Sequence, residues 1–198
     1  MSSLKNRRII LTDRPKGVPG PEFFSLITEA APEPGDGEFL VHNQFLSVEP
    51  AMRGWVNDAP NYSPPVPVGD VMRGFAVGKI IKSNNPDFNK GEIVSGLFGW
   101  QRYAVSDGSS VVTRMAGIDQ PPSYALGILG LNGITAYCGL IYQGKPKPDE
   151  TVVVSTAAGS VGSCVGQIAK IKGCRTVGIT GGATKVQQCL DEFGYDLS

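Results

Sequence analysis

The sequence predicts an α/β protein with a β-rich N-terminal domain, residues 1–122, followed by the first part of a nucleotide-binding domain, residues 123–198. In the N-terminal part, 13 of the chain's 15 prolines lie at or before Pro122 and break up short apolar runs. Such runs between Pro and Gly are typical of an antiparallel, barrel-like β domain. In the C-terminal part, a strand, helix, strand, helix order occupies about forty residues, which is the pattern of parallel strands with crossover helices.

Three segments of the N-terminal part contain the strand candidates: GEFLVHNQFLSV, FAVGKIIKS and GEIVSGLFGWQRYAV. Apolar residues alternate with polar ones in the first of them, as in a strand with one buried face. His42, the single histidine of the chain, follows this alternation. We therefore expect it to be a strand residue and not a metal ligand or a base.

After Pro122 the chain changes character. SYALGILGLNGITAYCGLIYQG is a long apolar segment rich in small residues and free of proline. It fits either two short helices that meet around Asn132 and Gly133 or one kinked helix. The polar stretch KPKPDE then separates it from the strand and helix pattern that follows.

The strand and helix pattern begins with TVVVS, a continuous β-branched run of the kind found in strands buried on both faces. VGSCVGQIAKIK follows as a helix that Gly173 can cap, with an apolar stripe formed by Val161, Val165, Ile168, Ala169 and Ile171. RTVGIT is the second strand. The second helix, residues 183–194, turns four apolar residues inward: Val186, Cys189, Leu190 and Phe193.

The junction between the first strand and its helix carries a glycine-rich fingerprint. Ala157, Gly159 and Gly162 occupy the positions of a G-x-G-x-x-G motif, with alanine in place of the first glycine. In dinucleotide-binding folds these small residues allow a tight turn, the approach of a pyrophosphate and close packing of the helix. The free amides and the dipole of the helix start favour an anion there. The alternative is that the small residues serve close packing alone.

The end of the second strand indicates which dinucleotide is bound. NAD-binding units carry an acidic residue there for the ribose hydroxyl. Here the chain has Thr180, Gly181 and Gly182, and then Lys185. Because no carboxylate would repel a 2′-phosphate and a lysine is available to bind it, we expect NADP(H). The alternative for Lys185 is a solvated lysine on a helix surface.

Composition excludes several classes of partner. Lys and Arg number 18, as do Asp and Glu, and like charges form no block, which argues against nucleic acid and membrane surfaces. The apolar patch near the N-terminus is too short for a secretion signal or a membrane span. Four scattered cysteines and one histidine favour a reduced cytoplasmic protein without a metal site.

Several motifs together carry a resemblance to a known family: SVEPAMRG, NYSPPVPVG, LGLNGITAYCGL, VVVSTAAGSVGSCVGQIAKIKGC and GITGGATK. Over almost its whole length the chain resembles the medium-chain dehydrogenase/reductase superfamily, in its zinc-independent branch of NADP-dependent alkenal/one reductases, which includes prostaglandin and curcumin reductases. The resemblance implies a GroES-like β domain and a Rossmann-type domain. It also implies NADPH-dependent reduction of the C=C bond of an enone or enal, and a homodimer for the full-length parent.

The resemblance also assigns roles to residues. It implies that Gly159, Ser160, Val161 and Gly162 cradle the pyrophosphate and that Lys185 holds the 2′-phosphate. Asn132 and Thr135 match the segment beside the nicotinamide.

Tyr62 matches an active-site tyrosine that is the candidate proton donor, with a packing or surface tyrosine as the alternative. Arg53 and Trp100 are candidates for shaping the substrate pocket. In SVEPAMRG, Ala51 stands where many relatives have a tyrosine, so the pocket or the proton path is expected to differ.

The nucleotide-binding domain is expected to be partial. A complete one has two βαβαβ halves, and only two strands of the first half are recognisable before Ser198. This favours a C-terminally truncated chain with weak or absent activity of its own. Two other functions remain open: a quinone reductase of the same superfamily, and a non-catalytic fragment that acts only as a binding or dimerisation module.

Overall fold

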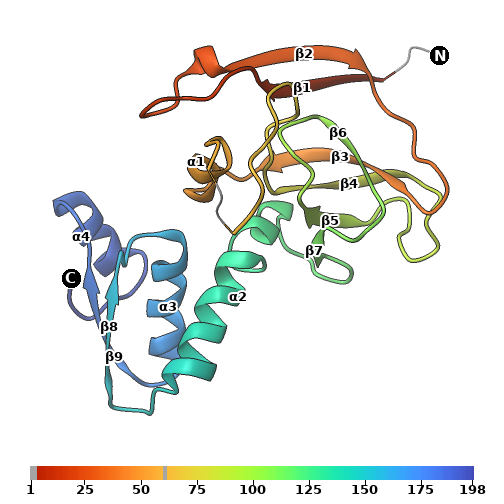
Figure 1. The fold of residues 1–198 in the computed structure, drawn as a ribbon. Coiled ribbons are helices and arrows are strands. Elements are labelled where there is room, and N and C mark those ends of the chain that lie inside the picture. Colours follow the sequence, from red (N-terminus) through yellow and green to blue (C-terminus); the bar gives the residue numbers. More distant parts are fainter. Residues whose placement is uncertain (1–3, 60–61) are drawn as a thin grey trace. The chain divides into compact units, whose positions relative to one another are not determined.

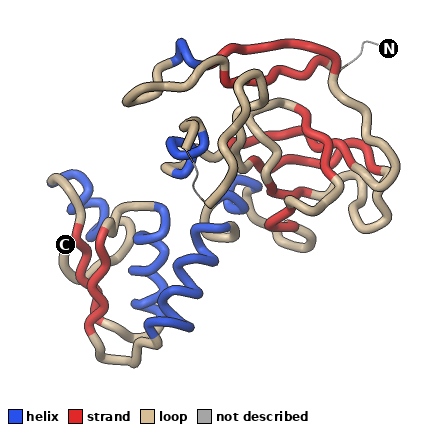
Figure 2. The backbone as a smooth tube through the Cα atoms, in the orientation of Figure 1, coloured by secondary structure: helices blue, strands red, loops and turns tan. Residues whose placement is uncertain are grey.

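The structure is a computed structural model, and it describes residues 4–59 and 62–198. The chain forms two compact units, Met1–Leu126 and Gly127–Ser198 (Figure 1). Pro122, where the sequence pattern changes, is the first residue of the 3-10 helix Pro122–Leu126. Strands make up most of the regular structure of the first unit and helices most of that of the second (Figure 2). Within the described residues, no helix combines the length and apolarity needed to cross a membrane.

The N-terminal unit is an antiparallel β structure, as predicted. It contains β1 (Lys5–Leu11), β2 (Phe24–Ala30), β3 (Phe39–Leu46), β4 (Ala76–Ser83), β5 (Ile93–Gly96), β6 (Tyr103–Ser106) and β7 (Val111–Arg114), with the short helix α1 (Ala51–Trp55) and the 3-10 helix Pro21–Phe23. β1 and β2 form a hairpin, and the other strands form one sheet in the order β6-β3-β4-β5-β7. Isolated bridges from Arg8 to Gln101 and from Ile10 to Val71 attach the hairpin to the rest.

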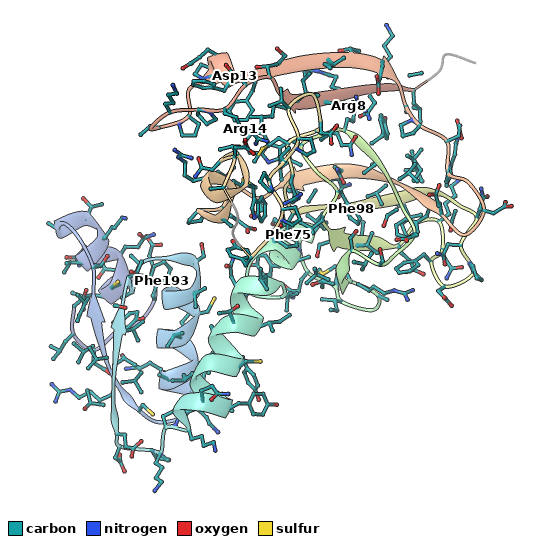
Figure 3. The ribbon with its side chains drawn as sticks, viewed as in Figure 1. Arg8, Asp13, Arg14, Phe75, Phe98 and Phe193 are labelled. Atoms are coloured by element: carbon teal, nitrogen blue, oxygen red, sulfur yellow. The ribbon has the colours of Figure 1, made fainter. Side chains whose placement is uncertain are left out.

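Two apolar clusters form the core of this unit. The first packs inward-facing residues of the sheet: Phe39, Val41, Ala76, Ile80, Val94, Phe98 and Ala104. Phe98 lies among the strands that supply this cluster (Figure 3). The second gathers residues of β1, α1 and the loops near them: Leu11, Met52, Trp55, Val56, Val66 and Met72. His42 lies in β3 as expected, and its ring stacks on Tyr103 with centroids 4.9 Å apart.

The C-terminal unit has the predicted strand, helix, strand, helix order. It contains α2 (Leu131–Tyr137), β8 (Thr151–Ser155), α3 (Ser160–Ile171), β9 (Arg175–Ile179) and α4 (Ala183–Asp191). β8 and β9 are parallel and in register, with Val153 opposite Val177. The prediction of a partial nucleotide-binding fold after a β domain is therefore confirmed.

The long apolar segment before β8 contains two helices, the 3-10 helix Pro122–Leu126 and a longer helix that begins with α2, and the break between them lies at residues 127–130 and not at Asn132 and Gly133. α2 passes without a break into wider π-helical turns, Cys138–Gly144. Asn132 and Gly133 lie in the first turn of α2 and mark no kink. A Cβ atom on Gly133 would lie 1.8 Å from the carbonyl oxygen of Ile128. The glycine is thus needed for the close approach of the chain that enters the helix.

Two burial predictions in this unit are wrong. Val153, expected in a strand buried on both faces, is 60% exposed, because alternation along β8 turns only Val152 and Val154 toward the packed face. Ile171, expected on the inward stripe of α3, is 83% exposed. It follows the buried Ala169 by two positions, which is more than half a helical turn, so it points away from the core.

The last residues of the chain form an isolated parallel bridge to β9, which the sequence did not reveal. Leu197 forms a parallel bridge with Val177, and the Gly178 amide donates to the Leu197 carbonyl at 2.8 Å. Asp196 fixes this segment, because its carboxylate accepts from the Thr176 amide at 2.7 Å, from the Thr176 hydroxyl at 3.0 Å and from Lys170.

Removing the Asp196 carboxylate should destabilise the C-terminal unit in a pH-dependent way. The hydrogen bond from Lys170, together with that from the Thr176 amide, lowers the pKa of Asp196 from 3.8 to about 2. A lowered folded-state pKa contributes stability above pH 3.8, and this contribution is lost as the pH falls toward 2. We expect Asp196→Asn to lower Tm at pH 6, with a difference from wild type that shrinks below pH 3.8, measured by circular dichroism. A difference that stays constant down to pH 2 would contradict this.

Candidate functional site

The turn between β8 and α3 is sharp and internally hydrogen-bonded. Thr156 adopts a left-handed conformation, φ 53°, which is unusual for a β-branched residue. The Gly159 amide donates to the Thr156 carbonyl at 2.8 Å, and the Ala157 amide donates to the Ile179 carbonyl at 3.1 Å. The turn is thus fixed both within itself and to the end of β9.

The fingerprint glycines are required by close contacts. A Cβ atom on Gly162 would lie 2.3 Å from the Thr156 carbonyl oxygen and 2.9 Å from the Ala157 Cα. A Cβ atom on Gly159 would lie 3.0 Å from the Thr156 Cγ2. Gly162 therefore serves the packing of α3 against the turn, which is one of the two roles that its position in the motif suggested.

The start of α3 leaves its amides available. Gly159 is the N-cap, no side chain caps the helix, and its first turn contains no acidic residue. Within residues 4–59 and 62–198, the amides of Ser160, Val161 and Gly162 have no intramolecular acceptor. Free amides at the positive end of a twelve-residue helix suit an anion such as a pyrophosphate. The residues present thus fit the phosphate groups of a dinucleotide.

A buried tyrosine supports this cradle from behind, and the sequence reasoning missed it. The Tyr195 hydroxyl donates to the Gly162 carbonyl at 2.7 Å. The side chain is only 4% exposed, and burial raises its pKa to about 12, so it remains a neutral donor. Gly166 and Gly178 make room for the ring, since a Cβ on Gly166 would lie 2.4 Å from the Tyr195 Cζ. Glycines on one helix and the neighbouring strand were the signal that a large side chain lies between them.

Lys185 lies at the same edge of the sheet as the cradle. The carboxyl ends of parallel strands meet at one edge, and α4 starts there just as α3 does. Lys185 is exposed in the first turn of α4, and it forms no ion pair with any described residue. It is thus available to bind an anion from solution.

Asn132 and Thr135 lie on α2. They are three positions apart and therefore lie on the same side of the helix. Thr135 is exposed and Asn132 is half-buried. Their assignment to the nicotinamide stays a prediction.

The three predicted residues of the N-terminal unit lie in separate environments. Tyr62 is 82% exposed and follows residues 60–61, which lie outside the described chain. Arg53, on α1, donates to the side chain of Asn57, which lies two residues beyond the end of that helix. Trp100 is half-buried and packs against Phe24, with ring centroids 5.9 Å apart. Among the described residues, Tyr62, Arg53 and Trp100 share no hydrogen bond or ring contact.

Arg73, which the sequence reasoning did not single out, holds the loop that follows Tyr62. Its Nη1 donates to the Ser63 hydroxyl at 2.8 Å and to the Pro64 carbonyl at 2.7 Å. Its guanidinium also lies over the ring of Trp55, 5.5 Å from the centroid. Arg73 therefore links the loop to a buried side chain of α1.

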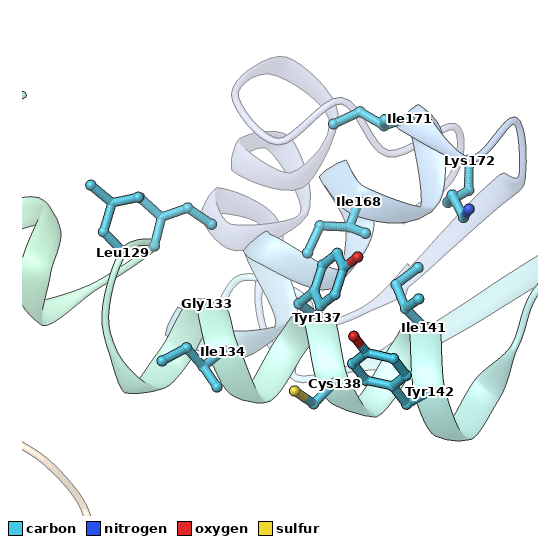
Figure 4. Close-up of a pocket in the computed structure, with 11 residues that line it drawn as sticks. Leu129, Gly133, Ile134, Tyr137, Cys138, Ile141, Tyr142, Ile168, Ile171 and Lys172 are labelled. Carbon is cyan, nitrogen blue, oxygen red and sulfur yellow. The ribbon is translucent and has the colours of Figure 1, made fainter. Parts of the chain in front are cut away.

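An apolar groove of 710 Å³ lies between α3 and the continuous helix formed by α2 and its π-helical turns (Figure 4). Tyr137 and Tyr142 contribute edge-to-face rings with centroids 5.9 Å apart. The exposed Ile171 also lines this groove, together with Ile168. None of the predicted cofactor or substrate residues lies in it.

The cysteines and histidine form no metal site in the part of the chain that the structure describes, where no three His, Cys, Asp or Glu side chains converge. All four cysteines are free. Burial raises the pKa of the Cys164 thiol, which keeps it protonated and unreactive.

Comparison with known proteins agrees with this fold and site. The model of a protein family described as the N-terminal domain of oxidoreductase matches residues 7–113, which is more than half of the chain. The chain therefore belongs to this oxidoreductase family, within the medium-chain dehydrogenase/reductase superfamily. The resemblance inferred from the motifs is thus confirmed.

Individual relatives support the same assignment. The NADPH-dependent curcumin reductase of Escherichia coli is 46% identical over 98% of this chain and 56% of the relative. The NADP⁺-dependent 2-alkenal reductase of Nicotiana tabacum is 35% identical over 98% of this chain and 57% of the relative. CurA from Vibrio vulnificus, crystallised with NADPH, has a TM-score of 0.84 and 46% identity over 96% of this chain. The chain spans 56% of the length of that structure's chain.

Substituting Gly162 should damage both folding and cofactor binding. In Gly162→Ala the new methyl group would force α3 away from the turn, which we expect to cost about 1–3 kcal/mol of unfolding free energy. NADPH affinity should fall with it, because the amides of the cradle move. Gly139→Ala is the matched control, since its Cβ meets nothing within 4 Å. Urea denaturation measures the unfolding free energy, and NADPH fluorescence measures the affinity. If Gly162→Ala and Gly139→Ala change both quantities equally, the role of Gly162 is contradicted.

Proposed function

We propose that this chain carries the β domain and the phosphate-binding part of an NADPH-dependent reductase that acts on the C=C bond of α,β-unsaturated ketones or aldehydes. The observation that carries the proposal is the cradle of free amides at Ser160, Val161 and Gly162, at the same edge of the sheet as Lys185, which pairs with no carboxylate of the described residues. The relatives named for NADPH and for 2-alkenal reduction support the substrate class.

The residues of the chain divide the work of such a reaction. The α3 amides hold the pyrophosphate, and Lys185 holds the 2′-phosphate that distinguishes NADPH from NADH. Asn132 and Thr135 orient the ring end of the cofactor. When bound, NADPH supplies a hydride for the β-carbon of the substrate. Tyr62 holds the proton that the α-carbon needs, and hydrogen-bond donors near the carbonyl oxygen stabilise the negative charge that develops there.

Two further proposals concern the setting of the protein. The four unpaired cysteines favour a reducing compartment, and we place the protein in the cytoplasm. Dimerisation of the full-length protein stays a prediction of the family resemblance.

Lys185→Ala should weaken NADPH binding by about tenfold, because one charge-assisted contact to the 2′-phosphate is lost. NADH affinity should stay the same, since NADH lacks that phosphate. Titrations followed by cofactor fluorescence measure both constants, with Lys5→Ala as a control on an exposed lysine of the other unit. If Lys185→Ala weakens both cofactors equally, or neither, Lys185 is a solvated helix lysine.

Tyr62→Phe should lower kcat for an enone by about a hundredfold if the hydroxyl donates the proton. The NADPH dissociation constant should not change, because the cofactor residues lie in the other unit. The assay follows NADPH absorbance with an enone and, in parallel, with a quinone. An unchanged kcat would show that Tyr62 is a surface residue without a role in proton transfer. If NADPH is oxidised faster with the quinone than with the enone, the quinone reductase alternative is favoured.

A further inference from the structure

A second pocket, of 280 Å³, opens on the N-terminal unit where residues 99–102 pass between β1 and β3. Backbone hydrogen bonds define the order of the strands: Arg102 donates to the Arg7 carbonyl and Asn43 donates to the Arg102 carbonyl, both at 2.9 Å. Residues directly opposite each other in antiparallel strands have side chains on the same face. Arg7, Arg102 and Asn43 therefore form one polar row across three neighbouring strands.

An apolar row runs beside the polar one. Leu26 pairs with Ile9 in the hairpin, and the Ile9 amide donates to the Trp100 carbonyl at 2.9 Å. Ile9 and Trp100 lie two positions from Arg7 and Arg102, so they share their face. Leu46 adds a further apolar side chain to the pocket lining. The pocket thus offers a cationic row and an apolar row side by side.

A bulge in β3 adds another polar group. The pairing of β3 with β4 shifts between Asn43 and Phe45, which leaves Gln44 as an extra residue. A bulge re-aims side chains that strict alternation would send to opposite faces. Here the adjacent Asn43 and Gln44 both line the pocket.

The polar row is not satisfied by the protein itself. Arg7 and Arg102 are like charges opposite each other, and neither pairs with a carboxylate among the described residues. Such a pair destabilises neighbouring strands. Asn43 is already engaged, because its Nδ2 donates to the Gln101 carbonyl at 2.9 Å. The row therefore has two cations that no carboxylate of residues 4–59 or 62–198 pairs with.

We propose that this pocket binds a small carboxylic acid with an apolar tail. The carboxylate lies against Arg7 and Arg102 and offsets their repulsion. The tail lies on Leu26, Ile9 and Trp100. The volume suits a ligand with a single ring. The proposal uses neither the cofactor cradle nor Tyr62; of its residues, only Trp100 is also a candidate for the substrate pocket of the proposed reductase.

The test uses 3-phenyllactate as the probe, titrated calorimetrically into the full 198-residue chain at low salt. We expect saturable binding that Arg102→Gln weakens by about tenfold, as expected when one charged contact is lost. A related ligand isolates the contribution of the carboxylate: 3-phenylpropanol lacks it and should bind more weakly than 3-phenyllactate.

Arg8→Gln is the matched control, because Arg8 is the next residue of β1 (Figure 3) and already pairs with Glu29 at 3.1 Å. It should leave the affinity for 3-phenyllactate unchanged.

Thermal unfolding without ligand gives a second readout. Arg102→Gln should raise Tm, since it removes the repulsion, whereas a residue that only supports the fold would lower it when replaced. Absence of binding by the folded wild-type chain, or binding that Arg102→Gln and Arg8→Gln affect equally, would overturn the proposal.

Discussion

The contact between Gly162 and the turn at Thr156 is the constraint on which the C-terminal unit depends. It brings the start of α3 so near to the end of β8 that no side chain fits between them. Tyr195 secures the same glycine from the other side through its hydrogen bond to the Gly162 carbonyl. The close approach leaves the first amides of α3 open, and these amides are the basis of the proposed phosphate site. The close packing of α3 and the proposed anion site thus both depend on one small residue.

The N-terminal unit follows a different principle, in which hydrogen-bonded strand register brings distant residues together. Residues 99–102 lie between β1 and β3 and join the hairpin to the main sheet. The same pairing that holds the sheet together places two arginines opposite each other, although they lie far apart in the chain. Arg73 acts in a similar way on a smaller scale, since it ties the loop after Tyr62 to the buried Trp55. Strand register therefore determines which side chains line the pocket of this unit.

Much of the fold could be predicted because its signals are local. Proline spacing identified the antiparallel domain, and the apolar run before Ala157 identified the first parallel strand. Burial was predicted less well, because a β-branched run indicates a strand but not whether one or both faces of that strand are covered. Val153 is exposed although its sequence environment is that of a buried strand. The burial of Ile171 was predicted wrongly for a related reason. The apolar residues of α3 cover a wider part of the helix surface than the stripe that packs against the core.

By itself, the sequence determined the class of protein, and it predicted the position of the phosphate cradle and the preference for NADPH. Each of these depends on residues close together in the chain, where spacing alone defines geometry. The tertiary structure decided that Tyr195 packs behind the start of α3, that Leu197 bridges to β9, and that Arg7 and Arg102 meet at one pocket. These contacts join residues far apart in the sequence or depend on the register of strand pairing. Local sequence patterns do not specify which strands become neighbours or in which register they pair.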